Sequence, residues 1–221
     1  FMKRLLLLFG ILSCWMTGYS QVTYTFTTAG ATGNSGPSQA NINNAYAGTS
    51  LDGTVTSVNG IREWVVPQSG LYRISAKGGV GGTAIGASTI PGKGALIEGD
   101  FFLSAGEVLH ILVGQKGQDR TNYSAGGGGG SFVTKAPHNT NASILVIAGG
   151  GGAASGDFSG MDASADSCST FDVQSGPADC TGLGGVSFTG NSGGAGGGFF
   201  TDGAGGGIGH GGKAYINGGT G

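Results

Sequence analysis

The sequence predicts a mainly β protein, an antiparallel sandwich or jelly roll with glycine-rich extended segments inserted into it. Two observations lead to this fold class. Short stretches of strand character, separated by turn residues, recur between residues 22 and 113, a spacing typical of antiparallel sandwiches. From Tyr123 onward, runs of glycine alternate with short apolar stretches, and glycine supplies 51 of the 221 residues. With 38% hydrophobic and only 10% charged residues, the composition does not match that of a disordered chain.

The N-terminus is typical of an export signal, and residues 1–20 are expected to be a signal peptide. Lys3 and Arg4 precede an apolar run over residues 5–12, and small residues come before Gln21. The run is too short to cross a bilayer as a helix. A second interpretation is a lipoprotein signal with Cys14 as the lipidated residue. The product is then secreted or held at the cell surface.

The rest of the chain, residues 21–221, is expected to form one glycine-rich β domain. Residues 21–122 are expected to be mainly strands, and residues 123–221 mainly glycine-rich segments interleaved with strands. Because the chain ends inside a glycine-rich segment at Gly221, we treat it as a candidate fragment of a longer product.

The first half contains five expected strands and one helical turn. Alternation or near-continuous apolar character gives strands at 22–27, 61–66, 71–76, 95–103 and 108–113. The turn at 68–70 predicts that 61–66 and 71–76 form a hairpin, and residues 40–46 are expected to be helical. The aromatic residues expected in the sandwich core are Trp64, Tyr72, Phe101 and Phe102.

The second half has glycine runs at 126–130, 149–152, 193–198 and 203–212, with expected strands at 131–134 and 144–147. Flexible linkers are one interpretation of the runs, and collagen is excluded because no Gly-X-Y period is sustained. We favour a third, in which the runs are extended threefold helices of the polyglycine type. Without Cβ atoms, neighbouring backbones can approach and hydrogen-bond each other, so that buried peptide groups find partners.

The number of cysteines and the net charge are consistent with an exported protein. Cys168 and Cys180 are expected to form one disulfide, with two free thiols as the alternative. Removal of Lys3 and Arg4 leaves eight basic and twelve acidic side chains, a formal net charge of −4. Such a chain is not expected to bind nucleic acid, and no later stretch is expected to span a membrane.

Motifs that could carry chemistry are weak. Residues 207–214 resemble a phosphate loop, but Ala214 replaces the Ser or Thr that would reach magnesium. His110, His138 and His210 lie far apart and fit no nucleophile motif, so no catalytic residue, cofactor or metal is expected. Four aromatic residues beside glycine-rich loops are candidates for an exposed contact surface, with shielding of the glycine bundle as the alternative: Phe158, Phe171, Phe199 and Phe200.

Several ordered pieces resemble the glycine-rich extracellular domain of the anaplastic lymphoma kinase and leukocyte tyrosine kinase receptors. The pieces are residues 24–33, 36–40, 43–46, 60–67, 109–117, 125–132, 145–152 and 190–198. The resemblance implies a jelly roll of the tumour-necrosis-factor type with polyglycine helices inserted through its loops, and a part in binding a protein ligand outside the cell. It implies no kinase activity here. Ala29 and Ile42 stand where receptor cysteines are expected.

These inferences favour a secreted or cell-surface, non-catalytic, glycine-rich binding or adhesion module. Its partner is expected to be an extracellular protein or glycan that the sequence does not identify. The alternative is a structural protein of the extracellular matrix or envelope without a discrete ligand.

Overall fold

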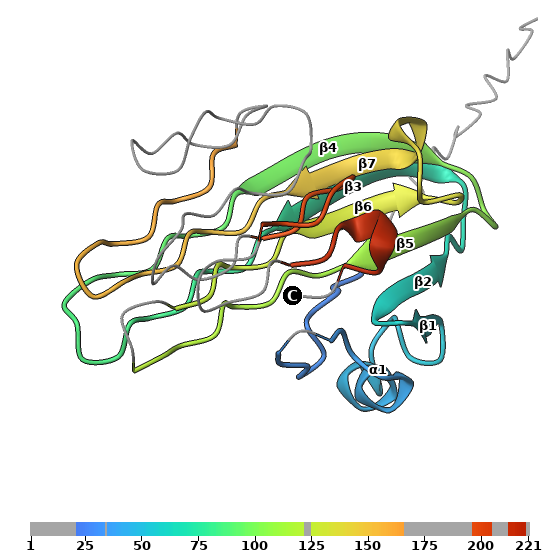
Figure 1. Ribbon diagram of the computed structural model, residues 1–221. Coiled ribbons are helices and arrows are strands. Elements are labelled where there is room, and N and C mark those ends of the chain that lie inside the picture. The colour runs from blue at the N-terminus through green and yellow to red at the C-terminus, as the bar shows by residue number, and fades with distance from the viewer. Residues whose placement is uncertain (1–20, 34, 122–124, 166–195, 205–211, 220–221) are drawn as a thin grey trace, which may run out of the picture.

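The computed structural model describes residues 21–33, 35–121, 125–165, 196–204 and 212–219, and within them the fold is mainly β (Figure 1). The strands are β1 Val55–Val58, β2 Ile61–Val65, β3 Gly70–Lys77, β4 Leu96–Leu103, β5 Val108–Leu112, β6 Ser131–Lys135 and β7 Ile144–Ala148. The helical elements are α1 Gln39–Tyr46 and the short 3-10 turns η1 Asn141–Ser143 and η2 Tyr215–Asn217. All neighbouring strands pair antiparallel, as the sequence predicts.

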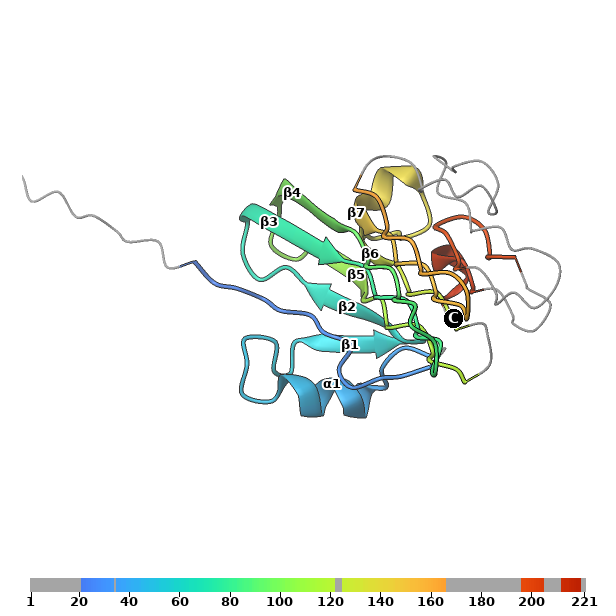
Figure 2. The ribbon, with the colours of Figure 1, turned by 90° about the vertical axis from the view of Figure 1, so that its left-hand side faces the viewer.

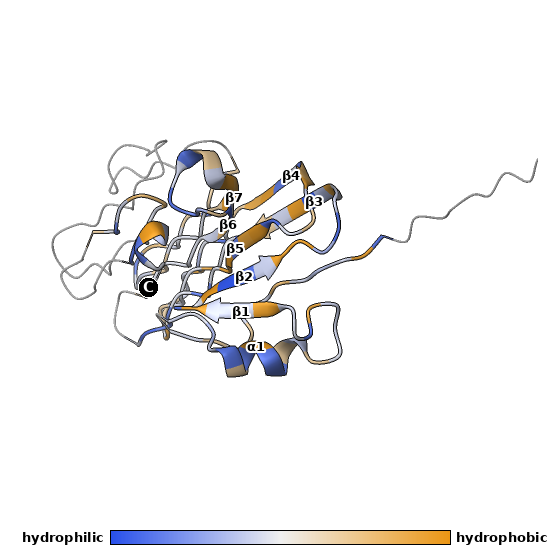
Figure 3. Ribbon diagram, turned by 90° about the vertical axis from the view of Figure 1, so that its right-hand side faces the viewer, coloured by the Kyte–Doolittle hydropathy of each residue, from blue (hydrophilic) through white to orange (hydrophobic). Residues whose placement is uncertain are grey.

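The strands form two sheets. Five of them make one sheet in the order β1-β2-β5-β6-β7, and β3 and β4 make the second. The two sheets share one hydrophobic core, in which Trp64 of β2, Leu109 of β5 and Leu103 of β4 are buried. In Figure 3 the orange of hydrophobic residues lies mainly on the strands and at the η2 turn, while the extended glycine-rich segments are mostly pale. Hydrophobic burial is therefore concentrated at the strand end of the molecule.

Aromatic residues near the N-terminus close one side of this core. The ring centroids of Tyr24 and Trp64 lie 4.8 Å apart, and Phe26 packs edge-on against Trp64 at 5.8 Å. Thr27 N–H donates to the Tyr46 hydroxyl at 3.1 Å, and the buried guanidinium of Arg62 donates to the Thr27 carbonyl. These contacts hold residues 22–27 in an extended conformation without pairing them to a sheet, so the strand predicted there is wrong.

Two further predictions are corrected by strand pairing. β3 pairs with β4 along its whole length, from Gly70 opposite Leu103 to Lys77 opposite Leu96, and not with β2. Side chains of a strand alternate between its faces, so Phe101 packs against the core while Phe102 points outward and is 67% exposed. Phe102 is thus a surface residue and not part of the core.

Helix α1 confirms the predicted helical turn and begins at a capping box. The Ser38 hydroxyl accepts from Asn41 N–H, and the Asn41 side chain accepts from Ser38 N–H at 3.0 Å. Both bonds satisfy amide groups that have no partner within the helix. Ile42 and Tyr46 then face the core.

The glycine-rich connections all extend from the same end of the two sheets (Figures 1 and 2). They follow β3, precede β4, follow β5, precede β6 and follow β7. We name six of their parts the first to sixth segments, in chain order: residues 78–83, 90–95, 113–120, 125–130, 149–154 and 160–163. Their backbones lie side by side and bond to one another rather than to the sheets.

Hydrogen bonds between these segments recur at every third residue. Gly79 N–H donates to Gly129 at 2.8 Å and Gly82 N–H to Gly126 at 2.7 Å, which joins the first and fourth segments. The same step of three residues appears between three other pairs of segments. The N–H groups of Gly78 and Gly81 donate to the carbonyls of Ala95 and Gly92, which joins the first and second segments. Gly151 and Ala154 likewise donate to Gly79 and Gly82, and Gly160 and Ala163 donate to Ile90 and Lys93. The first and fifth segments each bond to four of the other segments, and together they form the centre of the lattice.

Close backbone approach explains why glycine is needed at many of these positions. A Cβ atom placed on Gly79 would lie 2.0 Å from the Gln115 carbonyl oxygen, and one on Gly81 would lie 1.9 Å from that of Gly152. At the exposed Gly127 the nearest atom would be 3.8 Å away. Lattice-facing and outward-facing positions therefore differ sharply in the side chains they can accept.

Candidate functional site

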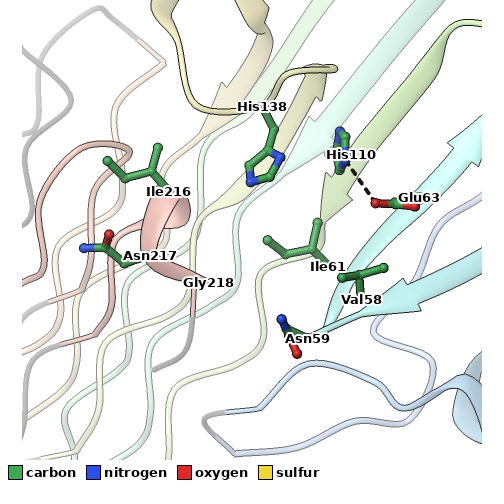
Figure 4. A pocket seen from close by; sticks show the side chains of 9 residues that line it. All are labelled: Val58, Asn59, Ile61, Glu63, His110, His138, Ile216, Asn217 and Gly218. Carbon is green, nitrogen blue, oxygen red and sulfur yellow. Dashed lines mark hydrogen bonds and ion pairs between the residues drawn. The ribbon is translucent and has the colours of Figure 1, made fainter.

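A pocket of about 400 Å³ lies beside the five-stranded sheet, between the turn joining β1 to β2 and the η2 turn (Figure 4). Its size falls within the range of small-ligand sites. Nine residues line it: Val58, Asn59, Ile61, Glu63, His110, His138, Ile216, Asn217 and Gly218. None of them is a lysine, arginine, serine, threonine or cysteine.

Strand register brings Glu63 and His110 together. The two residues are directly opposite each other in the β2–β5 ladder, and Glu63 Oε1 lies 3.2 Å from His110 Nε2. His110 is only 8% exposed, and the ring of His138 packs over its imidazole. An ionised carboxylate can only accept, so in this pair His110 Nε2–H donates a hydrogen bond to Glu63. His110 Nδ1 is buried and has no hydrogen-bond partner among the described residues.

His138 lies in the loop after β6 and packs over His110. The two ring centroids are 4.6 Å apart, and His138 meets Tyr215 edge-on at 5.8 Å. Partial burial lowers the pKa of His138, the nearby His110 lowers it further, and Glu63 acts in the opposite direction. We therefore expect His138 to be neutral at physiological pH.

The lowered pKa of His138 predicts a pH-dependent stability. The folded protein binds this proton less readily than the unfolded chain, so stability is retained above the ordinary histidine pKa of about 6.5 and is lost as pH falls below it. We expect the native protein to lose more stability than the His138→Gln variant between pH 7.5 and pH 5.0, measured by urea unfolding at each pH. Equal losses in the two proteins would contradict the assigned burial of this ring.

Tyr215 forms the base of this region and is fully buried. Its hydroxyl lies 2.9 Å from Thr134 Oγ1 and donates to the His110 carbonyl at 3.4 Å. Burial raises the pKa of Tyr215 to about 12, although the Thr134 hydroxyl partly opposes this effect. The phenol is therefore uncharged and fixes the backbone of β5 beneath the two imidazoles.

The buried hydroxyl pair predicts a measurable coupling energy. Tyr215→Phe leaves the Thr134 hydroxyl without its side-chain partner, and we expect a loss of about 1–2 kcal/mol in unfolding free energy. Thr134→Val is expected to lose a similar amount. The double variant should lose clearly less than the sum of the two, because no buried hydroxyl then remains unpaired. Additive losses in urea unfolding would argue against the bond.

Asp202 holds the C-terminal wall of the pocket. Its carboxylate accepts from Lys213 Nζ at 2.7 Å, from Ala214 N–H at 2.8 Å and from Asn217 Nδ2 at 3.2 Å. The Lys213 ammonium is the largest of the causes that lower the pKa of Asp202 to about 2, followed by the two amide donors. These bonds place Asn217 and its neighbour Ile216 at the rim of the pocket.

The predicted contact aromatics lie in different environments. Phe158 is 59% exposed, in the loop after the fifth segment. Phe200 is half-buried, and Phe199 is only 1% exposed, with its ring centroid 5.3 Å from that of Tyr215. The expectation of an exposed Phe199 is corrected accordingly, since it packs beneath the pocket in a second core cluster with Phe132. Phe171, Cys168 and Cys180 lie outside the described residues, as does His210.

Sequence reasoning did not anticipate this site. His110 and His138 are separated by 28 positions, and nothing local to either residue indicates that their rings meet. The one available signal was the shared central position of Glu63 and His110 in two expected strands, which becomes informative only when those strands are known to be neighbours. Within the described residues, no group of three or more His, Cys, Asp or Glu side chains is arranged to hold a metal ion.

Comparison with known proteins relates part of the chain to a receptor. The leukocyte tyrosine kinase receptor of Mus musculus is 41% identical over 99 residues, which is 43% of this chain. This stretch supports a related domain of the extracellular type. The match spans 11% of the receptor, so the chain corresponds to about a tenth of its length. No family model matches the sequence. The similarity is compatible with an extracellular or cell-surface location, and no helix in the described ranges is long and apolar enough to cross a membrane.

Proposed function

We propose that this chain is a non-catalytic binding module, secreted or held at the cell surface, whose glycine-rich half is a rigid scaffold. The observation that carries the proposal is the three-residue step of the hydrogen bonds between the glycine-rich segments. A flexible linker would not order its amide groups in this way, because ordering glycine is entropically unfavourable unless other interactions offset it. An ordered lattice instead gives fixed positions to the loops that connect its segments.

The proposal includes a specific architecture for the glycine-rich segments and for the two sheets. An extended threefold helix turns once in three residues and directs its amide and carbonyl groups outward, which agrees with bonds at every third residue. We therefore propose polyglycine-type helices packed side by side. The two antiparallel sheets with a common core are proposed to form a jelly roll of the tumour-necrosis-factor type. Together they are proposed to make one domain over residues 21–221, after removal of residues 1–20.

The proposed contact surface lies on the loops of the glycine-rich half. Phe158 is the best-supported member, because its ring is 59% exposed and its loop is fixed by bonds from Ser155 N–H to the Phe158 carbonyl and from Phe158 N–H to Ser155 Oγ. Phe200 and Phe171 are further proposed members of the contact surface. A disulfide between Cys168 and Cys180 is proposed to constrain the loop that contains Phe171. Exposed aromatic rings on ordered backbone are favoured binding groups.

The partner is proposed to be an extracellular protein or glycan. The related stretch in a protein named as a receptor supports this class of function but not the identity of the ligand. The nine residues that line the pocket include no serine, threonine, cysteine or lysine, and its carboxylate, Glu63, is hydrogen-bonded to His110. We therefore place the function in recognition rather than in catalysis.

Two measurements on the exported, oxidised protein test the proposal. Amide hydrogen exchange of peptides from the first to sixth segments should be slow, at a rate near that of β5 and far below that of the loop at residues 86–89. If these segments exchanged at the rate of an unfolded chain, the proposal of a rigid scaffold would be contradicted. Titration onto cells or matrix extracts should then show saturable binding that Phe158→Ala weakens and Phe102→Ala does not. Concentration-dependent self-assembly without any saturable partner would instead favour a structural matrix role.

A further inference from the structure

We propose that the pocket beside Glu63 binds a lysine side chain of a partner, with the Glu63 carboxylate as the counter-ion of its ammonium group. This inference goes beyond the binding-module function, because it assigns a ligand chemistry to a pocket at the strand end rather than to the loops of the glycine-rich half. It rests on the charge of the pocket, on its apolar walls and on the arrangement of its two imidazoles.

Among its described lining residues, the pocket carries one carboxylate and no lysine or arginine. The carboxylate belongs to Glu63. The Glu63 side chain is 37% exposed, and among the described residues His110 is its single hydrogen-bond partner. A partly desolvated carboxylate interacts more strongly with a cation than one in open water. Anionic ligands such as phosphates or acidic sugars are disfavoured for the same reason.

The walls match the rest of a lysine side chain. Val58, Ile61 and Ile216 present aliphatic groups on both sides of the pocket, and Figure 4 shows them around the space in front of the imidazoles. The four-carbon stem of lysine commonly packs along such apolar surface while its head group remains polar. An ammonium group has three donors and no acceptor, so a favourable site needs acceptors besides the carboxylate.

Two asparagines at the rim supply those acceptors. Asn217 donates its amide nitrogen to Asp202 Oδ1 at 3.2 Å, which leaves the carbonyl oxygen of the amide as its accepting end. Asn59 is exposed on the turn between β1 and β2, where its φ of 51° directs the chain into Gly60 and β2. The pocket thus offers oxygen acceptors on two sides and imidazole rings at its base.

The imidazoles make binding sensitive to pH. The groups that face Glu63 and each other are His110 from β5, His138 from the loop after β6 and the neutral Tyr215 from η2. A proton taken up by His138 places a positive charge near Glu63 and competes with an incoming ammonium. Proton and lysine are therefore linked as mutually exclusive ligands, and the affinity for lysine falls on acidification.

The test compares two capped amino acids that differ only at the end of the side chain. Nα-acetyl-lysine methylamide and its uncharged counterpart Nα-acetyl-norleucine methylamide are titrated into the full chain, with the ring signals of the histidines followed by NMR. At pH 7.5 the lysine probe should shift the His110 and His138 signals saturably and bind about tenfold more tightly than the norleucine probe. At pH 5.0 this preference should largely disappear.

Variants separate the proposed roles from loss of folding. Glu63→Gln keeps an acceptor for His110 Nε2 and should fold, yet it should bind both probes equally. Glu98→Gln, on the exposed outer face of β4, removes the same charge elsewhere and should bind lysine as the native protein does. Between pH 7.5 and pH 5.0, His138→Gln should lose a smaller fraction of its affinity for the lysine probe than the native protein does. Equal binding of the two probes by the native protein, or unchanged lysine binding by Glu63→Gln, would overturn the proposal.

Discussion

Gly128→Ala is expected to destabilise the protein by about 3 kcal/mol, whereas Gly127→Ala, one position earlier, is expected to be neutral or slightly stabilising. A Cβ atom on Gly128 would lie 2.1 Å from the Gly79 carbonyl oxygen and 2.8 Å from the backbone of Val80. These atoms belong to the central first segment, which cannot move without breaking its bonds to four neighbours. At Gly127 a Cβ atom would have its nearest contact at 3.8 Å.

The two variants form a matched pair, because the chemical change is identical and the positions are adjacent. Urea unfolding of the exported protein, followed by far-ultraviolet circular dichroism, gives the free energies to compare. Where Gly128→Ala fails to accumulate, its unfolding cannot be measured, but Gly127→Ala should still be produced at the native level. Similar behaviour of both variants, stable or unstable, would contradict the lattice.

Phe199→Ala is expected to cost about 3–4 kcal/mol of unfolding free energy, and Phe158→Ala less than about 0.5 kcal/mol. Phe199 is 1% exposed and lies against Phe132 and Tyr215, with ring centroids at 6.3 Å and 5.3 Å. Removal of the ring leaves a cavity beneath the pocket that these rigid neighbours cannot fill. Phe158 is mostly in solvent, so its removal takes away little buried area.

This pair of variants also separates stability from recognition. Phe199→Ala should alter the His138 ring signal, because the base of the pocket loosens when Tyr215 loses its stacking partner. Phe158→Ala should leave that signal unchanged. If Phe199→Ala were as stable as the native protein, the second core cluster would not contribute to folding and the C-terminal segment would not be docked.

Local sequence patterns predicted the positions of the strands better than they predicted which strands pair with each other. Alternation and turn residues located β2, β4 and β5 to within one or two residues, because burial of one sheet face requires that periodicity. The hairpin between 61–66 and 71–76 was wrong, since the end of β2 continues its bonds with the neighbour β5. Val66 N–H donates to the Glu107 carbonyl, and Gly106 N–H donates to that of Val66. The residues of a short turn do not indicate which of two competing strands will pair with β2.

The site was harder to predict than the fold. Phe199 was expected at the surface because glycine surrounds it in sequence, yet its burial depends on Phe132 and Tyr215, which lie far from it along the chain. The meeting of His110 with His138 likewise depends on how the loop after β6 returns across β5. Long-range packing decides both cases, and composition around a residue carries little information about it.

The three-residue bonding step also constrains how such a chain can change in length. In the first segment, Val80 and Thr83 occupy every third position between glycines that approach other backbones. One inserted or deleted residue would rotate the following part of the segment by about a third of a turn. Side chains would then point at neighbouring carbonyl groups. Segments of this kind are expected to grow or shrink in multiples of three residues, and related chains should differ in the lengths of these segments by that interval.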